Sequence, residues 1–289
     1  MRYKFLRFPG GKAKALTLSY DDGCVQDKKL IAIADKYGIK VTLNINGSLM
    51  SPSMSRLTAG ELKELIKNGG HEIANHGARH IANGLVSVAD GISEVLDCRR
   101  KLESDFDTII RGMAYPDSGI RRINSGITKD DVKGYLKGLG IAYARSTGSD
   151  NDSFELPADL YDWMPTVRHS NPMLMEYLDK FLKEGISTYP SARASKLFYL
   201  WGHSFEFDND NNWDLFESFC KTAGGRDDIF YATNIEIADY INAYNALIFN
   251  LENTKVYNPT DKQIWFEATD MPDGHKTVCI QPGERLLLD

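Results

Sequence analysis

Two adjacent aspartates and three histidines follow predicted strands, where their side chains could do chemistry. Asp21 and Asp22 come directly after the apolar run A-L-T-L-S-Y. His76 and His80 follow a short predicted strand, and His203 follows the apolar run F-Y-L-W-G. In parallel β/α folds, sites are built at the C-terminal ends of strands. These five side chains are therefore candidates for a single site.

The residue types suit metal-assisted hydrolysis. Imidazole is the commonest nitrogen ligand of zinc and similar ions, and we interpret His76 and His80 as ligands. Two histidines and one carboxylate leave positions on a metal for water and substrate. The other aspartate can accept a proton from the water, and the distant His203 can protonate a leaving amine. Such a set is complete for the hydrolysis of an amide.

Each cluster also has a purely structural interpretation. Asp-Asp-Gly alone is explained equally well as the N-cap of a helix that begins near Val25. His71, close to the other two histidines, is interpreted as a packed residue at the start of its strand. A lone histidine after an apolar strand, such as His203, is usually a buried one with its hydrogen bonds satisfied. Its aromatic neighbours could instead hold its pKa near neutrality, as a general acid requires.

Strands and helices alternate around these clusters. We expect strands over residues 15–20, 40–46, 71–75, 109–115, 141–145, 197–201 and 229–233. We expect helices over residues 28–37, 58–68, 86–106, 129–139, 172–183, 212–222 and 235–249, with a capping box at Thr58–Glu61. This rhythm predicts parallel β/α units in a barrel or a doubly wound sheet. We divide the chain into an α/β domain, residues 1–250, and a small β-rich segment, residues 251–289.

Composition narrows the class of protein further. The chain of 289 residues carries 34 Lys and Arg against 40 Asp and Glu, a net charge of −6, which argues against a nucleic-acid partner. It has no apolar run of about 18 residues, so no transmembrane helix is expected. Four cysteines without a C-x-x-C pair indicate free thiols. No apolar h-region follows Met1–Pro9, so we predict a cytoplasmic location, or an extracytoplasmic one if the chain was trimmed.

The motifs and their order resemble those of the NodB-type polysaccharide deacetylases, carbohydrate esterase family four. Ser19–Gly23 is similar to the T-F-D-D-G motif of that family, and His76–His80 to its H-[ST]-x-x-H motif. Asp159–Trp163 resembles D-x-x-D-W, and Trp201–His203 resembles the closing L-x-H motif. The resemblance covers roughly residues 15–233. It implies an α/β fold, a distorted (β/α) barrel of about seven parallel strands, followed here by a small C-terminal β tail.

The resemblance also implies a role for each matching residue. Asp21 is expected to be the general base and His203 the general acid, with Asp162 or Asp159 orienting His203. Asp22, His76 and His80 are expected to bind one divalent metal ion, zinc in the first place, with cobalt, nickel or manganese as alternatives. Substrate contacts are expected from three aromatic residues, Trp163, Tyr115 and Trp201.

The chain departs from the family pattern at one charged position. The family usually shows R-x-P-Y-G, whose arginine pairs with the catalytic base, and Ala114 occupies the arginine position here. Arg145 ends the next predicted strand, and we hypothesise that it supplies the missing cation. Gly77 replaces the usual Ser or Thr, which matters little to a metal site.

Three alternatives to de-N-acetylation of a sugar or polysaccharide stay open. A cytoplasmic hydrolase of small linear or cyclic amides would keep the fold and the chemistry. A non-haem iron oxygenase also uses two histidines and a carboxylate, but typically on an all-β jelly roll. A catalytically silent carbohydrate-binding relative would bind no metal. The acyl group, the substrate and the oligomeric state are not indicated by the sequence.

Overall fold

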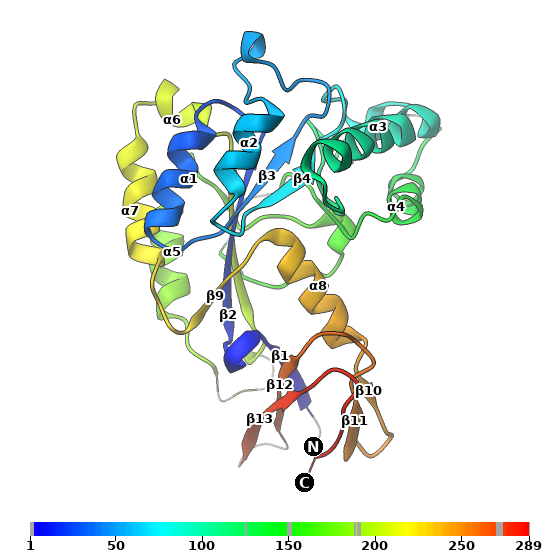
Figure 1. Cartoon of the computed structure of the whole chain (residues 1–289). Coiled ribbons are helices and arrows are strands. Elements are labelled where there is room, and N and C mark those ends of the chain that lie inside the picture. Colours follow the sequence, from blue (N-terminus) through cyan, green and yellow to red (C-terminus); the bar gives the residue numbers. More distant parts are fainter. Residues whose placement is uncertain are drawn as a thin grey trace.

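The computed structural model describes residues 3–124, 126–148, 152–187, 189, 192–269 and 274–288. Within these residues, a curled sheet of eight strands forms the centre of the fold, and all its pairings are parallel (Figure 1). Seven strands follow one another in space in the order β6 (Tyr143–Arg145), β5 (Gly112–Ala114), β4 (Glu72–Asn75), β3 (Val41–Ile45), β2 (Lys14–Asp21), β8 (Lys196–Gly202) and β7 (Val167–Arg168). The eighth, β9 (Ile229–Tyr231), pairs with the start of β2. The predicted α/β fold, a distorted (β/α) barrel, is confirmed.

Eight α-helices are found in the described part of the chain, and most of them connect successive strands of the sheet. They are α1 (Asp27–Lys36), α2 (Ala59–Ile66), α3 (Val88–Phe106), α4 (Lys129–Gly138), α5 (Leu174–Lys183), α6 (Phe205–Asn209), α7 (Trp213–Ala223) and α8 (Asn234–Asn245). Short 3₁₀ turns lie at η1 (Pro9–Gly11), η2 (Pro52–Met54), η3 (Asn83–Leu85) and η4 (Leu160–Asp162). The predicted capping box is confirmed, because Thr58 and Glu61 exchange side-chain to backbone hydrogen bonds at the start of α2.

Strand β2 carries both the core and the site because its side chains alternate between two faces of the sheet. Leu16, Leu18 and Tyr20 are fully buried in the main apolar cluster, together with residues of the surrounding helices. Thr17 and Ser19 point to the opposite face, where Thr17 donates to Asn234 and Ser19 accepts from Asn44. Asp21, the last residue of β2, continues this polar row at the C-terminal end of the strand.

Two small antiparallel sheets lie beside the barrel, near both chain termini (Figure 1). One contains β1 (Tyr3–Arg7), β12 (Ile264–Thr269) and β13 (His275–Ile280), and the other contains β10 (Ile248–Phe249), β11 (Lys255–Tyr257) and β14 (Arg285–Leu287). The small C-terminal β segment is thus present. The N-terminal strand pairs with it, held by a buried ion pair between Arg7 and Glu267 at 3.0 Å. The domain boundary at residue 250 stays a prediction. The pairing of the N-terminal strand β1 with the C-terminal segment was not predicted.

Three further expectations concern the whole fold. The parallel sheet differs from the jelly roll on which the oxygenase alternative depends. The four cysteines are free thiols. Among the described helices, none has the length and apolar character needed to cross a bilayer.

Candidate active site

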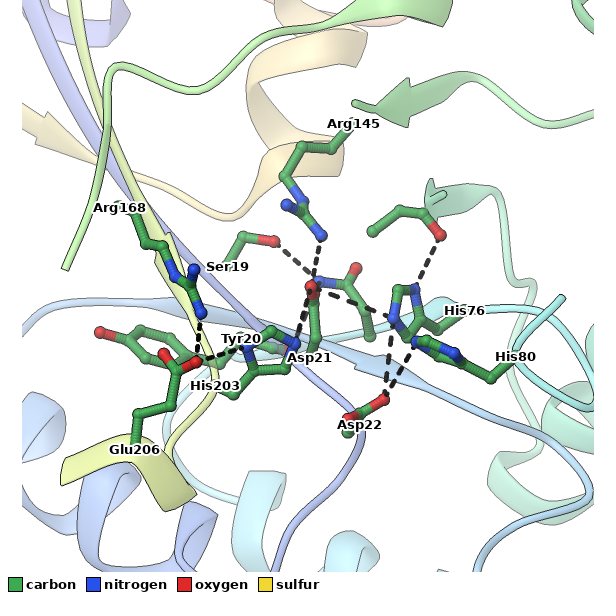
Figure 2. A network of polar contacts seen from close by, with 12 residues as sticks. Ser19, Tyr20, Asp21, Asp22, His76, His80, Arg145, Arg168, His203 and Glu206 are labelled. Atoms are coloured by element: carbon green, nitrogen blue, oxygen red, sulfur yellow. Dashed lines mark hydrogen bonds and ion pairs between the residues drawn. The ribbon is translucent and has the colours of Figure 1, made fainter. Parts of the chain in front are cut away.

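The C-terminal ends of strands β2, β4, β6 and β8 bring six of the predicted site residues together (Figure 2): Asp21, Asp22, His76, His80, Arg145 and His203. All four strands run in the same direction, so their C-terminal ends lie at one edge of the sheet. Asp21 lies centrally in this group, with Asp22 and the two histidines His76 and His80 on one side and His203 on the other.

Asp22, His76 and His80 form the one cluster among the described residues with the composition and spacing of a metal site. One ligand atom from each lies within 4.8 Å of the other two. Asp22 Oδ1 is 3.8 Å from His76 Nε2 and 3.7 Å from His80 Nε2. A single ion at the usual ligand distances of about 2 Å fits between three atoms placed in this way.

Two of these three residues, Asp22 and His80, have unusual backbone conformations. Asp22 has a φ of +83° and His80 a φ of +62°, in the left-handed region that residues other than glycine seldom adopt. Such conformations cost about 1–3 kcal/mol each and persist where the surrounding structure enforces them. The reversal at Asp22 turns its carboxylate away from that of Asp21. Gly77, between the histidines, has a φ of +74°, a conformation that a Ser or Thr would adopt only with strain.

The ring of His76 is oriented by the neighbouring strand. Its Nδ1 lies 2.9 Å from the backbone carbonyl oxygen of Ala114, at the end of β5. A carbonyl only accepts, so Nδ1 carries the hydrogen and the lone pair of Nε2 faces Asp22. Ala114 is the residue at the family's arginine position, and here its backbone positions a candidate ligand.

The loop between the two histidines is held by a buried carboxylate from α3. Glu94 accepts hydrogen bonds from the backbone nitrogen and from the Nε atom of Arg79, at 2.9 and 2.5 Å. The backbone nitrogen of Ala78 donates to the carbonyl of Glu94 at 3.0 Å. Three contacts from one residue thus fix the loop in the conformation that brings His80 to Asp22.

Unsatisfied polar atoms indicate that the cluster suits a cation. Among the described residues, neither Asp22 Oδ1 nor His76 Nε2 has a hydrogen-bond partner, although both atoms are buried. The other carboxylate oxygen of Asp22 is paired with Arg56, 3.1 Å away. Burying an acceptor without a donor is costly, and a divalent ion would compensate these atoms.

Asp21 is buried and bound by a cation and an amide. Arg145 Nη2 lies 2.6 Å from Asp21 Oδ2, and Asn44 donates to Asp21 Oδ1 at 2.8 Å. Burial raises the pKa of Asp21, but the charge of Arg145, with smaller contributions from His76 and His203, brings it below the ordinary value. The carboxylate is therefore held in its ionised form.

His203 presents one ring nitrogen to the centre of the site. Its Nε2 lies 4.0 Å from Asp21 Oδ2, and its Nδ1 lies 3.3 Å from Glu206 Oε1. Burial lowers the pKa of His203, but the carboxylates of Glu206 and Asp21 raise it above the ordinary value of 6.5. The imidazole thus keeps a proton at higher pH than a free histidine does.

The expectation that Asp162 or Asp159 orients His203 is wrong. Asp162 pairs with Lys129 at 3.1 Å and Asp159 pairs with Lys133 at 2.7 Å, both lysines belonging to α4. The segment η4, which ends at Asp162 and directly follows Asp159, lies against β6 and α4, and Glu206 occupies the position beside His203 instead.

Two of the three aromatic residues expected at the substrate are core residues. Trp163 is 1% exposed and packs edge-on against Tyr143 and Tyr199. Its backbone hydrogen-bonds to β6, which directs its side chain into the interior. Tyr115 is 2% exposed and its hydroxyl donates to the carbonyl of Tyr161 at 2.9 Å. Trp201 lies closer to the site, with its ring centroid 6.2 Å from that of His203, and its contact with substrate stays a prediction.

Four contacting residues were not foreseen: Asn44, Arg56, Glu94 and Glu206. Two of them carry a signal in the sequence. Asn44 is a polar residue within an apolar strand, and Glu206 follows His203 by three residues, about one helical turn. Arg56, in a loop, and Glu94, on a helix, are not distinguished from ordinary surface charges by their spacing.

Comparison with known proteins gives a family match that covers part of the site. Residues 8–143 match the family model described as polysaccharide deacetylase, a range that includes the Asp22, His76 and His80 cluster and ends before Arg145 and His203. No curated protein matches the chain.

Solved structures share the fold at low sequence identity. A protein of Mycobacterium smegmatis named as a polysaccharide deacetylase is 14% identical, with a TM-score of 0.60 over 85% of this chain and 96% of that chain. One from Pseudomonas aeruginosa PAO1, also named as a polysaccharide deacetylase, is 15% identical, with a TM-score of 0.56 over 80% and 92%. The allantoinase Puue is 12% identical, with a TM-score of 0.58 over 80% and 91%. Residues 8–143 thus match the polysaccharide deacetylase family, and most of the chain shares its fold with proteins named as polysaccharide deacetylases.

Proposed function

We propose that this enzyme is a metal-dependent hydrolase that removes the acetyl group from the nitrogen of an N-acetylated sugar, oligosaccharide or polysaccharide. The observation that carries the proposal is the convergence of three ligand atoms, from Asp22, His76 and His80, within 4.8 Å of one another. A buried carboxylate, Asp21, and an imidazole, His203, lie next to this cluster, as hydrolysis of an amide requires.

The Asp22, His76 and His80 side chains would hold the ion. When bound, a divalent ion lowers the pKa of water and polarises a carbonyl group. Zinc suits one carboxylate and two imidazoles, and cobalt, nickel or manganese can occupy the same set of donors. The orientation of His76 by the carbonyl of Ala114 is the kind of outer contact that fixes a ligand for a metal.

Asp21 serves as the general base in this proposal. Its carboxylate accepts a proton from the attacking water while the water oxygen forms a bond to the acetyl carbonyl carbon. Arg145 and Asn44 keep the carboxylate ionised and fixed in direction. Because Arg145 uses Asp21 Oδ2 and Asn44 uses Oδ1, the carboxylate cannot rotate freely.

His203 serves as the general acid. As the bond between the carbonyl carbon and the nitrogen breaks, Nε2 of the imidazolium donates its proton to that nitrogen. The products are the free amine and acetate. Deprotonated Nε2 and protonated Asp21 lie about 4 Å apart, and exchange with water returns both groups to their starting states.

A panel of substrates and a metal analysis test the proposal together. The purified protein would be analysed for bound metal, stripped with a chelator, and assayed for acetate release from N-acetylated sugars and chitin-type oligomers with each metal restored. Turnover of a small linear or cyclic amide with no acetate released from any sugar would favour the small-amide alternative. A protein that retains no metal and hydrolyses nothing would favour the silent carbohydrate-binding alternative.

Two aspartate variants separate the metal site from the base. Asp22→Ala should lose metal in the analysis, since one of three ligands is gone. Asp21→Asn should retain metal, and its kcat should fall by about 10²–10⁴, the usual contribution of a general base. Full activity of Asp21→Asn would exclude Asp21 as the base, whatever the substrate.

A further inference from the structure

The Nδ1 atom of His203 faces a carboxylate that belongs to the next helix. His203 directly follows the last residue of β8, and Glu206 lies in the first turn of α6, where its backbone nitrogen donates to the carbonyl of His203 at 3.1 Å. Glu206 Oε1 is 3.3 Å from His203 Nδ1, while Asp21 Oδ2 is 4.0 Å from His203 Nε2. Each ring nitrogen therefore faces one carboxylate, and the two carboxylates lie on opposite sides of the ring (Figure 2).

Glu206 is itself held in place by the end of β7. His169 Nε2 lies 2.9 Å from Glu206 Oε2, and Arg168 pairs with Oε1. The His169 ring is buried and contacts Tyr20 and Phe207, with ring centroids 5.7 and 4.2 Å away. The carboxylate of Glu206 thus has little of the freedom of a surface glutamate.

The glycine between Trp201 and His203 belongs to the same arrangement. A Cβ atom on Gly202 would lie 2.1 Å from Nδ1 of His169, far inside contact distance. The absence of a side chain at this position leaves room for the His169 ring beside the strand that carries His203. The sequence W-G-H is therefore explained locally by the packing of a second histidine.

We propose that Glu206 is the positioning residue for His203, that it orients the ring through Nδ1 so that Nε2 faces the scissile nitrogen, and that His169 fixes Glu206. This inference rests on the proposed function of His203 as general acid. A carboxylate at Nδ1 selects the tautomer with hydrogen on that atom and stabilises the imidazolium form. The position expected for Asp162 or Asp159 is thus taken by a residue of another element, Glu206 of α6.

The charges around His203 are consistent with this role. Besides Glu206, the ring faces Asp21 and, at longer range, Asp22, whereas Arg168 and His169 lie on the far side of Glu206. Burial lowers the pKa of His203, and the Glu206 carboxylate is the largest influence that raises it. Burial also raises the pKa of Glu206, but His169 and His203 bring it far below its ordinary value, so Glu206 stays charged.

A matched pair of carboxylate-to-amide variants tests the proposal, Glu206→Gln against Asp162→Asn. Both would be measured for kcat and its pH profile on the best substrate, for bound zinc, and for the titration of His203 by NMR. The chain has six histidines, and His203→Gln identifies the His203 signal. Glu206→Gln should lower kcat by about 10–100-fold and retain zinc, because an orienting contact is lost while the ligands remain. The pKa of His203 should fall by about one unit or more, and the alkaline limb of kcat with it.

Asp162→Asn should leave kcat, the pH profile and the His203 titration unchanged. The proposal is overturned if Glu206→Gln keeps the wild-type titration of His203, or if Asp162→Asn shifts it as much. If the wild type hydrolyses no amide, the proposed function fails, and the titration alone still decides the role of Glu206. If Glu206→Gln does not fold, His169→Phe keeps the ring contacts and removes the nitrogen that holds Glu206. This variant should lower the pKa of His203 in the same direction, and an unchanged value would overturn the proposal.

Discussion

Substitution of Arg145 by methionine tests the central ion pair of the site. The Arg145 and Asp21 side chains are 1% and 3% exposed, and their charged atoms lie 2.6 Å apart. Methionine keeps an unbranched side chain of similar length beside the Trp201 ring and removes the charge. Breaking a buried pair by removing one partner costs about 3–5 kcal/mol, because the other charge is left uncompensated. We expect the lower end of this range, since Asn44 still donates to Asp21.

The loss of unfolding free energy in Arg145→Met should be larger at neutral pH than in acid. In the wild type, the pKa of Asp21 lies below its ordinary value of 3.8, so its ion pair stabilises the fold above that pH and is lost as the pH falls through the lower folded value. Without Arg145, burial raises the pKa of Asp21. The difference in unfolding free energy between wild type and Arg145→Met should therefore be largest at neutral pH and should shrink in acid. The acid limb of kcat/KM should move up by about 1–3 pH units.

Urea unfolding at several pH values and a pH profile of acetate release measure both effects. Arg111→Met is the matched control, because Arg111 pairs with Asp239 before the start of β5, away from the site, and is 37% exposed. That pair is expected to contribute less than about 1 kcal/mol and to leave the pH profile unchanged. The reasoning is refuted if Arg145→Met unfolds within about 1 kcal/mol of the wild type at pH 7 and keeps its acid limb.

Two further predictions concern buried residues away from the metal cluster. Trp163→Phe should lower the free energy of unfolding, measured in urea, by about 1–3 kcal/mol and leave KM within twofold, because Trp163 packs in the core. A tenfold rise in KM at unchanged stability would restore the assignment of Trp163 to the substrate groove. Burial raises the pKa of Glu72 from 4.5 to about 7, so the folded state binds more protons in this window and stability falls as pH rises through it, by about 3 kcal/mol at most. Glu72→Gln should remove this slope from urea unfolding measured across the same window, and an unchanged slope would show that another group titrates there.

The order of strands and helices could be predicted because each boundary is marked locally. The apolar run at residues 15–20 becomes β2 over Lys14–Asp21, and the capping box at Thr58 opens α2 as expected. The pairing of β1 with β12 joins segments about 260 residues apart, and a strand of five residues that carries two charges, Lys4 and Arg7, has no local mark of its partner. Pairing over such separations depends on the completed fold rather than on neighbouring residues.

The site could be predicted as far as its residues follow strands, and no further. Asp21, Asp22, His76 and His203 follow from the rule that parallel strands end at one edge. The positions of the aromatic residues could not be predicted in this way. A large ring suits a core and a sugar groove equally well, and only its burial decides between them. Trp163 was placed in the core by backbone hydrogen bonds to β6, a contact that its own motif does not specify.

Arg145 reaches Asp21 from a strand position outside the family's arginine motif. Ala114, which stands where the family has arginine, is the register partner of Arg145 on the adjacent parallel strand. Neighbouring strands lie about 4.8 Å apart, and an arginine side chain is long enough to bridge that step. A cation moved by one strand at the same level can thus still reach Asp21, as the 2.6 Å contact shows. The group that orients His76 is the backbone carbonyl of Ala114, which any residue at this position would offer. Placing the arginine on the neighbouring strand therefore keeps the charge beside the base and leaves the orientation of this candidate ligand unchanged.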